Sequence, residues 1–243
     1  MGPVPLPVPC SDVRQQTLRF GESWARIAPW RGGGGAAHLV VGPEATASSD
    51  VIRRCVDQAR RSGYHSVLTS AVGVACADAF VAAGFEVREH LHLLAMELQH
   101  PPEEPALPTE KAGRRDRAPV LLVDDASFDG FWRLGSAGLR DAIDATPVSR
   151  FQVGRRNHLV VAYAITGSAA DQGYLQRIAV DPTARREGWA RALVADGLGW
   201  LWRHGCSRAF VNTQLHNDAA IALYESFGFR RLPQGLCVLG RPL

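Results

Sequence analysis

The sequence of 243 residues lacks the marks of several protein classes. Its cysteines stand singly, with no C-x-x-C pair and no Cys/His cluster at zinc-ligand spacing. They are Cys10, Cys55, Cys76, Cys206 and Cys237. There is no basic start followed by an apolar run, as in a signal peptide, and no stretch long enough to cross a membrane. We therefore expect a cytoplasmic protein with reduced thiols, no bound metal and no membrane partner.

An excess of charge of one sign is also missing. The formal net charge is +3 and charged residues make up 21% of the chain, without the clustered basic character typical of nucleic-acid binding. We therefore expect no nucleic-acid partner. By contrast, 46% of the residues are hydrophobic, which is enough for a sizeable core in one large domain or two small ones.

A proline-rich and charged segment divides the chain. From residue 99 to about 119 it reads QHPPEEPALPTEKAGRRDRAP, and it has too few aliphatic residues to fold alone. We predict a domain at 1–98, a linker at 99–117 and a second domain at 118–243. A glycine-rich stretch from Arg31 to Gly35 lacks a following Gly-Lys-Ser/Thr and is interpreted as a flexible turn, not a phosphate loop.

The hydrophobic pattern of the second half predicts a mixed α/β domain. A short buried strand at 120–123 and a helix at about 129–145 come first. Further strands are expected at 149–155, 158–166, 173–180, 209–214, 229–231 and 236–239, the first two joined by a hairpin turn at Asn157. Further helices are expected at 188–204 and 218–227.

One segment of this half combines a strand, a Pro-marked loop and a helix start. It runs from Ile178 to Ala190 and contains Arg185-x-x-Gly188-x-Ala190. The N-terminus of a helix offers unbonded N–H groups and a positive dipole end to an anion. Gly188 keeps side-chain bulk away from the turn, while Arg185 and Arg186 add positive charge. The segment therefore predicts a site for a ligand with a pyrophosphate and a 3′-phosphate.

This segment resembles the Q/R-x-x-G-x-G/A signature of the GCN5-related N-acetyltransferases (GNAT). The run from Asn217 to Phe229 is similar to the second hallmark of that family, N-x-x-A-x-x-x-Y-x-x-x-G-F, at the expected distance. With the preceding strands, the resemblance covers the second half of the chain. It implies a GNAT fold at 118–243 and the transfer of an acetyl group from acetyl-CoA (coenzyme A) to a primary amine by direct attack. The acceptor would be a protein α-amine or a small-molecule amine.

The resemblance also implies roles for single residues. The strand residues Ile178, Ala179 and Val180 would hold the pantetheine and the acetyl carbonyl, with Val180 N–H as an oxyanion donor. The pyrophosphate would be wrapped by the backbone of Arg185, Arg186, Glu187, Gly188, Trp189 and Ala190. Asn217 would bond the pantetheine arm, and Tyr224 would protonate the departing thiolate. The alternatives are that Asn217 only caps a helix and that Tyr224 is an ordinary half-buried aromatic residue.

The residues do not identify a general base. Many family members place a Glu on the strand that is 173–180 here, but this strand has no carboxylate. Gln176 can orient a water but cannot accept a proton. A site without a strong base favours an α-amine, because about 10% of such amines are neutral at pH 7. His216, beside Asn217, is a candidate for contact with the substrate or the cofactor.

The first half repeats the outline of the second. A helix at 50–62, a strand at 64–69, a helix at 77–83 and an alternating strand up to residue 98 are punctuated by Gly63 and by Gly84-Phe85. We therefore expect tandem acetyltransferase folds, the first of them abbreviated. Phe80 stands where the second half has Tyr224, and no phosphate-binding run precedes residue 50. The first copy should have lost its cofactor chemistry.

Two other functions stay open on the sequence. The missing carboxylate favours a non-catalytic coenzyme A sensor or interaction protein, whereas Tyr224 and the complete phosphate turn favour an enzyme. A two-domain thiol-pathway enzyme, a mycothiol-type acetyltransferase, is the other alternative. No residue pattern specifies the acceptor.

Overall fold

The computed structural model describes residues 15–32, 35–42 and 48–243. Cys10, and Gly33 and Gly34 of the expected flexible turn, lie outside these residues. The chain forms two compact units, one of Met1–Arg88 with Val238–Leu243 and the other of Glu89–Cys237. Among the described helices, none is long and apolar enough to cross a membrane.

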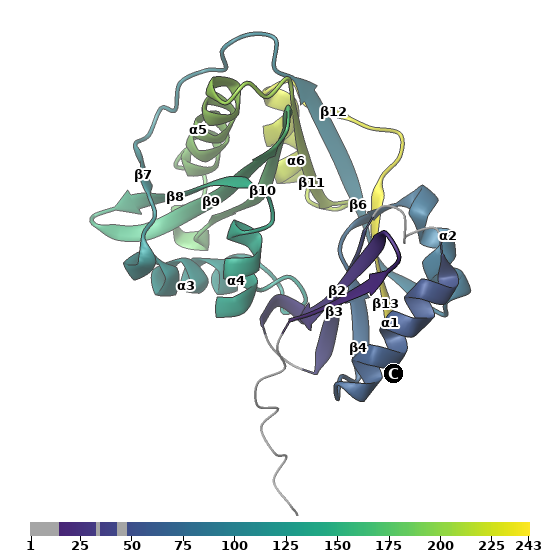
Figure 1. The fold of residues 1–243 in the computed structure, drawn as a ribbon. Helices are drawn as coiled ribbons and strands as arrows, with labels where there is room; N and C mark the ends of the chain where they lie inside the picture. The colour runs from purple at the N-terminus through teal and green to yellow at the C-terminus, as the bar shows by residue number, and fades with distance from the viewer. Residues whose placement is uncertain (1–14, 33–34, 43–47) are drawn as a thin grey trace, which may run out of the picture. The chain divides into compact units, whose positions relative to one another are not determined.

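The first unit combines a mixed sheet with helices (Figure 1). Its strands are β1 (Gln16–Phe20), β2 (Ser23–Pro29), β3 (Ala36–Val41), β4 (Ser66–Thr69), β5 (Val72–Gly73) and the end of β13 (Leu236–Pro242). The helices are the short 3-10 helix Trp30–Gly32, α1 (Ser49–Arg61) and α2 (Val74–Ala82). Within this unit the strand order is β1-β2-β3-β4-β13, in which only β3 and β4 are parallel.

The second unit has a larger mixed sheet (Figure 1). Its strands are β6 (Glu86–Glu97), β7 (Thr109–Lys111), β8 (Val148–Arg156), β9 (Leu159–Ala169), β10 (Gln172–Val180), β11 (Arg208–Gln214) and β12 (Arg230–Arg231). Its helices are α3 (Arg117–Ser127), α4 (Ser136–Ile143), α5 (Trp189–Arg203) and α6 (Asp218–Ser226), with 3-10 turns at Arg114–Asp116 and Pro182–Ala184. The order is β6-β11-β10-β9-β8-β7, in which only β10 and β11 are parallel, and β12 pairs with β6.

Helices cover both faces of the second sheet, and β9 shows how the sequence achieves this. Side chains of a strand point alternately to opposite faces. Tyr163 and Ile165 therefore pack with α3 and α4, whereas Ala162 and Ala164 pack with α5. Each of these residues is at most 3% exposed. A strand buried on both faces reads as a continuous apolar run, as the segment 159–165 does.

Left-handed glycines end the helices at corresponding places in the two units. After α1, Gly63 has φ 82°, and after α5, Gly205 has φ 74°. In each case the next residue donates its N–H back into the last turn of the helix, as a Schellman cap requires. Tyr64 N–H donates to Ala59 O at 3.2 Å, and Cys206 N–H donates to Leu201 O at 3.1 Å. The repeat expected from the sequence therefore extends to backbone geometry.

Most of the expected elements agree with the structure to within a few residues, but two do not. The expected strand at 120–123 is wrong, because these residues belong to α3. A short apolar run fits a buried helix as well as a buried strand. The helix expected from residue 129 begins only at Ser136, because Asp129 Oδ1 accepts the N–H groups of Phe131 and Trp132 in a turn at 3.0 and 3.2 Å.

The division of the chain also differs from the expected one. Strand β6 lies in the expected first domain but pairs with β11 in the second unit, while the end of β13 pairs with β4 in the first. The expected linker at 99–117 contains β7, which pairs with β8. At its end, Asp116 accepts the N–H of Gly113 at 2.7 Å and pairs with Arg155 at 2.6 Å. These two contacts hold the pKa of the Asp116 carboxyl below its usual range.

Candidate active site

The parallel strands β10 and β11 pair only at their beginnings. Their paired residues run from Gln172↔Arg208 to Tyr174↔Phe210, although β10 continues to Val180 and β11 continues to Gln214. A β-bulge shifts the register of β10 against β9 between residues 175 and 177, and bulges bend strands. We call residues 175–180 of β10 and 211–214 of β11 the open strand ends. Backbone groups that normally join two parallel strands lack that partner here.

The backbone of β10 faces the open side at alternate residues. In antiparallel sheets, pairs that exchange two hydrogen bonds alternate with pairs that exchange none. Just after β10, Asp181 N–H donates to Val161 O at 2.8 Å. By this alternation, Val180 and Ile178 point their N–H and C=O groups away from β9. The Val180 carbonyl accepts the hydroxyl of Ser127 at 3.1 Å, and by the same alternation the Val180 N–H points to the open side of β10.

The turn before α5 presents a row of unbonded backbone donors. Arg186 and Gly188 have φ values of 65° and 94°, so left-handed residues alternate with right-handed or extended ones, as in anion-binding nests. Among the described residues, no acceptor is bonded to the backbone N–H groups of residues 185–191. The first hydrogen bond of the helix runs from Ala192 N–H to Gly188 O. Residues 185–188 are exposed, so these donors and the helix dipole face solvent.

The side chains of this turn add positive charge. Within the described part of the chain, Arg185 and Arg186 form no ion pair, whereas Glu187 is paired with Arg156. Glu187 also accepts the indole N–H of Trp189 at 3.2 Å. The only carboxylate of the turn is therefore neutralised, and two guanidinium groups stay available to an anion.

Two of the expected cofactor residues have side chains in the core. Trp189 is 6% exposed, and its ring fills the space that a side chain at position 154 would need, because a Cβ on Gly154 would lie 2.5 Å from it. Only the backbone of Trp189 and of Ala190 lies at the turn. Ala179 packs with α3 and α4, and the alternation along β10 directs its backbone to β9.

Asn217 is the N-cap of α6. Its Oδ1 accepts the N–H of Ala220 at 3.3 Å, and its Nδ2 donates to Thr213 Oγ1 at 3.1 Å. The capping role that the sequence offered as an alternative is therefore present. One amide hydrogen of Asn217 is left for another acceptor.

Tyr224 lies in the same helix and packs against Phe229 with ring centroids 5.8 Å apart. It is 7% exposed, and its hydroxyl has no hydrogen-bond partner among the described residues. Burial raises the pKa of Tyr224 to about 12, because a low-dielectric surrounding disfavours the phenolate. The hydroxyl therefore stays protonated at neutral pH.

A cavity of about 260 Å³ lies at the end of the open strands. It is lined by Ser127, Phe128, Asp129, Gln214, His216 and Asn217. Ser127 ties this cavity to Val180 through its hydroxyl. The sequence pointed to His216 and Asn217, but it missed Ser127 and Asp129. The sequence predicted Asp129 at the start of a helix. The only sequence signal of a turn here was the S-x-D spacing of Ser127 and Asp129 after an apolar run.

The buried carboxylate of Asp124 is bound to β10 and to the loop after α3. Asp124 is 0% exposed and accepts the N–H of Leu134 at 2.7 Å and the guanidinium of Arg177 at 2.5 and 2.9 Å. It also accepts the hydroxyl of Tyr163. These contacts attach the loop after α3 to β10, and the ion pair with Arg177 favours the ionised, already committed form of this buried carboxylate. Gln176 is also engaged, since its Nε2 donates to Thr146 Oγ1 at 3.1 Å.

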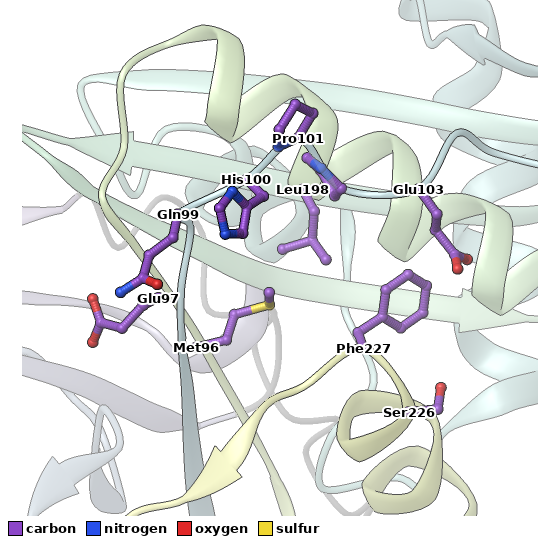
Figure 2. A pocket seen from close by; sticks show the side chains of 10 residues that line it. Met96, Glu97, Gln99, His100, Pro101, Glu103, Leu198, Ser226 and Phe227 are labelled. Atoms are coloured by element: carbon purple, nitrogen blue, oxygen red, sulfur yellow. The ribbon is translucent and has the colours of Figure 1, made fainter.

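A second cavity of about 310 Å³ lies along α5, where the chain passes from β6 toward β7. Figure 2 shows the segment 99–103 running past Leu198, with Phe227 opposite. Glu103 of this segment pairs with Arg191 in the first turn of α5 at 2.5 Å. The lining of this cavity shares no residue with the first cavity.

The geometry of residues 172–190 agrees with the family comparison. Residues 119–229 match the model of the Acetyltransferase (GNAT) family. This segment, slightly less than half of the chain, is a GNAT domain. The GNAT domain holds both sequence motifs, the open strand ends and the turn before α5, so the resemblance drawn from the motifs is confirmed.

Known relatives match a shorter part of the chain. The ribosomal protein bS18-alanine N-acetyltransferase of Escherichia coli (strain K12) is 40% identical over 74 residues, which is 30% of this chain and 50% of that protein. The mycothiol acetyltransferase of Kocuria rhizophila is 34% identical over 74 residues, or 30% of this chain and 24% of that protein. The chain thus spans about half the length, or less, of these curated relatives.

Solved structures resemble nearly the whole chain. A tandem GNAT protein from the clavulanic acid biosynthesis pathway has a TM-score of 0.65 and 14% identity, covering 92% of this chain and 81% of that one. A GCN5-related N-acetyltransferase from Kribbella flavida has a TM-score of 0.62 and 15% identity, covering 94% and 90%. The mixed α/β fold, with a GNAT-like unit before the GNAT domain, is therefore confirmed.

Proposed function

We propose that the GNAT domain transfers the acetyl group of acetyl-CoA to a primary amine. The observation that carries this proposal is the combination of outward-facing amides on β10 with the unbonded N–H groups at residues 185–191. The first set suits an amide-containing arm and a carbonyl oxygen, and the second suits a pyrophosphate. An extended ligand with both features fits this arrangement.

The chain's own residues have separate tasks in this proposal. The amides of Ile178 and Val180 orient the ligand arm and the acetyl carbonyl, and Val180 N–H stabilises the negative charge that develops on the carbonyl oxygen. Arg185, Arg186 and the turn bind the phosphates. Acetyl-CoA supplies the activated acetyl group as a thioester.

Tyr224 is best suited to donate a hydrogen bond to the leaving sulfur. With a pKa of about 12, its hydroxyl is a weaker acid than an ordinary thiol, whose reference value is about 8.5. Complete transfer of the proton from the tyrosine to the thiolate is therefore uphill in the free protein. A hydrogen bond that strengthens as the charge on sulfur grows avoids this cost and still lowers the barrier.

The acceptor is proposed to be an α-amine. The match to the ribosomal protein bS18-alanine N-acetyltransferase supports this class, because the name of that relative specifies an alanine acceptor. The absence of a carboxylate base on β10 supports it as well, since an α-amine is more often neutral at pH 7 than a lysine amine.

Titration calorimetry and thiol release test the proposal on the full chain. Acetyl-CoA should bind with a stoichiometry near one per chain, and coenzyme A should be released when an amine is added. The panel of amines comprises alanine-initiated peptides, small amines and aminoglycosides. A folded protein without saturable binding at sub-millimolar acetyl-CoA would show that the proposed site is wrong.

The same assay separates the two alternatives. Binding without thiol release for any amine would favour a non-catalytic coenzyme A sensor. A mycothiol-type acetyltransferase is supported by the match to the Kocuria rhizophila protein and by the tandem fold. Release of thiol with the amine precursor of mycothiol, in preference to peptides, would establish that activity.

A further inference from the structure

We propose that the cavity lined by Ser127, Phe128, Asp129, Gln214, His216 and Asn217 is the acceptor-amine site. In this acceptor pocket, Asp129 binds the ammonium form of the substrate and His216 takes the proton from the attacking nitrogen. The inference rests on the proposed function and adds to it a general base and a substrate class.

The position of the acceptor pocket is the first argument. Its walls come from the end of α3 and from the residues that follow the open end of β11. Ser127 lies in the wall and donates its hydroxyl to the carbonyl of Val180 at 3.1 Å. Val180 is the last residue of β10 and the proposed oxyanion donor. A nucleophile in the pocket therefore stands beside the carbon that it attacks.

The charge of the pocket is the second argument. Asp129 contributes the only carboxylate of the lining, and none of the described lining residues is a lysine or an arginine. One oxygen of Asp129 accepts the N–H groups of Phe131 and Trp132, which fixes the carboxylate in place. The other oxygen has no partner among the described residues. Arg133, on the same loop, is directed to Asp125 at 3.2 Å and does not neutralise it.

The same charge distribution indicates the class of the acceptor. A single fixed carboxylate attracts an ammonium group, but the pocket offers no cation to a substrate carboxylate. A free amino acid carries both groups, whereas a peptide or an amino-acid amide carries only the ammonium near the reacting nitrogen. We therefore expect amides and peptide N-termini to be preferred to free amino acids.

His216 is the remaining titratable group of the lining, and imidazole accepts protons near neutral pH. Its ring has no hydrogen-bond partner within the described chain. Asp124, the alternative near β10, is engaged in four contacts with Leu134, Tyr163 and Arg177. Asp129 lines the same pocket as His216, and Asp218 lies in the first turn of α6, two residues after His216 in the sequence.

The transfer balances with these groups. The bound ammonium first loses one proton to solvent through His216. The resulting neutral amine attacks the thioester carbonyl carbon, a C–N bond forms and the C–S bond breaks. The nitrogen loses one proton to His216, which passes it to solvent. The departing sulfur accepts a hydrogen bond from Tyr224 and gains one proton from solvent. One amide and one free thiol result, with no net proton change from the neutral amine.

The test uses the full chain, acetyl-CoA and two probes, alaninamide and an alanine-initiated hexapeptide, with free alanine for comparison. His216→Gln should lower kcat about 100-fold, leave the affinity for acetyl-CoA unchanged and remove the acidic limb of the pH profile of kcat. Asp129→Asn keeps an oxygen for the turn and removes the charge. It should raise the KM for both probes about tenfold with a smaller change in kcat.

Matched controls lie in the first unit. His65→Gln and Asp78→Asn replace exposed side chains there and should leave kcat and KM unchanged. Alaninamide should be used more efficiently than alanine after correction for the fraction of neutral amine. Circular dichroism and acetyl-CoA affinity report whether each variant is folded, and His216→Asn provides a second test of the base.

The outcomes separate this inference from the proposed function. If the unmodified protein releases no thiol with either probe or with any other amine, both are overturned. If it releases thiol but both His216 variants keep its kcat and pH profile, only the role of His216 is wrong. If alanine is used as well as alaninamide and Asp129→Asn leaves KM unchanged, the pocket is not the acceptor site.

Discussion

The two units contain the same kind of parallel strand pair but differ in how far the pairing extends. In the first unit, β3 and β4 pair from Ala36↔Ser66 to Leu39↔Thr69, so every residue of β4 is paired. In the second unit, β10 and β11 separate after Tyr174↔Phe210. In the first unit, β4 therefore leaves no unpaired backbone groups on the side of β3 to which the arm of a cofactor could bind. The comparison indicates that the fold is compatible with a closed strand pair, whereas the proposed cofactor site uses the open one.

The helices that follow these strand pairs, α2 and α6, place an aromatic residue in the same geometry, but only Tyr224 of α6 carries a hydroxyl. Phe85 N–H donates to Phe80 O at 3.0 Å, and Phe229 N–H donates to Tyr224 O at 3.2 Å. The ring pairs are edge-to-face, with centroids 5.4 and 5.8 Å apart. Phe80 is 0% exposed and has no hydroxyl. The same position therefore serves packing in one unit and presents a proton donor in the other.

The largest expected effect is the loss of acetyl-CoA binding when a left-handed glycine of the second unit, but not of the first, is replaced. Gly188→Glu should abolish acetyl-CoA binding, because it adds bulk and negative charge to the anion-binding turn. Gly63→Glu is the matched control, since Gly63 has φ 82° and open space around its missing Cβ. It carries the same backbone strain but should keep the affinity. Titration calorimetry measures both, and equal losses would attribute the effect to folding.

The second prediction concerns the packing role of the first unit. Phe80→Ala should lower the free energy of unfolding by about 3–5 kcal/mol, because it empties a fully buried site. Val81→Ala, at a neighbouring residue that is 53% exposed, should cost about 0.5 kcal/mol or less. Urea unfolding provides the measurement. Similar costs for the two variants would contradict the assignment of Phe80 to the core.

The third prediction tests the chemical role of the corresponding position in the second unit. Tyr224→Phe should lower kcat about 10- to 100-fold and leave the dissociation constant of acetyl-CoA nearly unchanged, since it removes one donor and little contact area. Phe80→Tyr should leave the stoichiometry at one acetyl-CoA per chain. Unchanged turnover of Tyr224→Phe, with the chemical step rate-limiting, would exclude the proposed role, and a second bound cofactor would show that unit one retains a site.

Local signals in the sequence predicted much of this structure. The hairpin turn at Asn157 is confirmed, with φ 50° there and 67° at His158, as a type I′ turn requires. The glycines after α1 and α5 and the strand–turn–helix of residues 172–190 were predicted for the same reason. Each depends on a backbone conformation or periodicity that neighbouring residues specify.

Other features were missed because they depend on contacts distant in sequence. Nothing within β6 indicates that it pairs with β11, which lies over a hundred residues later. The run at 120–123 is apolar in either conformation, so only packing against β9 decides for a helix. That error displaced the turn at Asp129. The acceptor pocket was consequently only half visible, through His216 and Asn217.

The smallest expected effect is a difference in acid sensitivity. The first unit has a half-buried imidazole on β3, where His38 forms a hydrogen bond with the hydroxyl of Ser70 at 2.9 Å. Burial, with Arg31 and Arg26 nearby, lowers the pKa of His38 to about 4. The corresponding strand of the second unit is β10, and it contains no histidine.

The sign of this effect follows from proton linkage. In the unfolded chain a histidine has a pKa of about 6.5, so between that pH and about 4 the unfolded state binds the proton and the folded state does not. The stabilising contribution of neutral His38 is therefore complete above pH 6.5 and is lost as the pH falls. Because the side chain is only half-buried, we expect the free energy of unfolding to fall by about 1–2 kcal/mol between pH 7 and 4.5.

His38→Gln should remove that part of the pH dependence of the free energy of unfolding. Hydrogen exchange at acidic pH should show the first unit opening before the GNAT domain. Equal pH dependence in the variant, or earlier opening of the GNAT domain, would contradict this reading of the comparison.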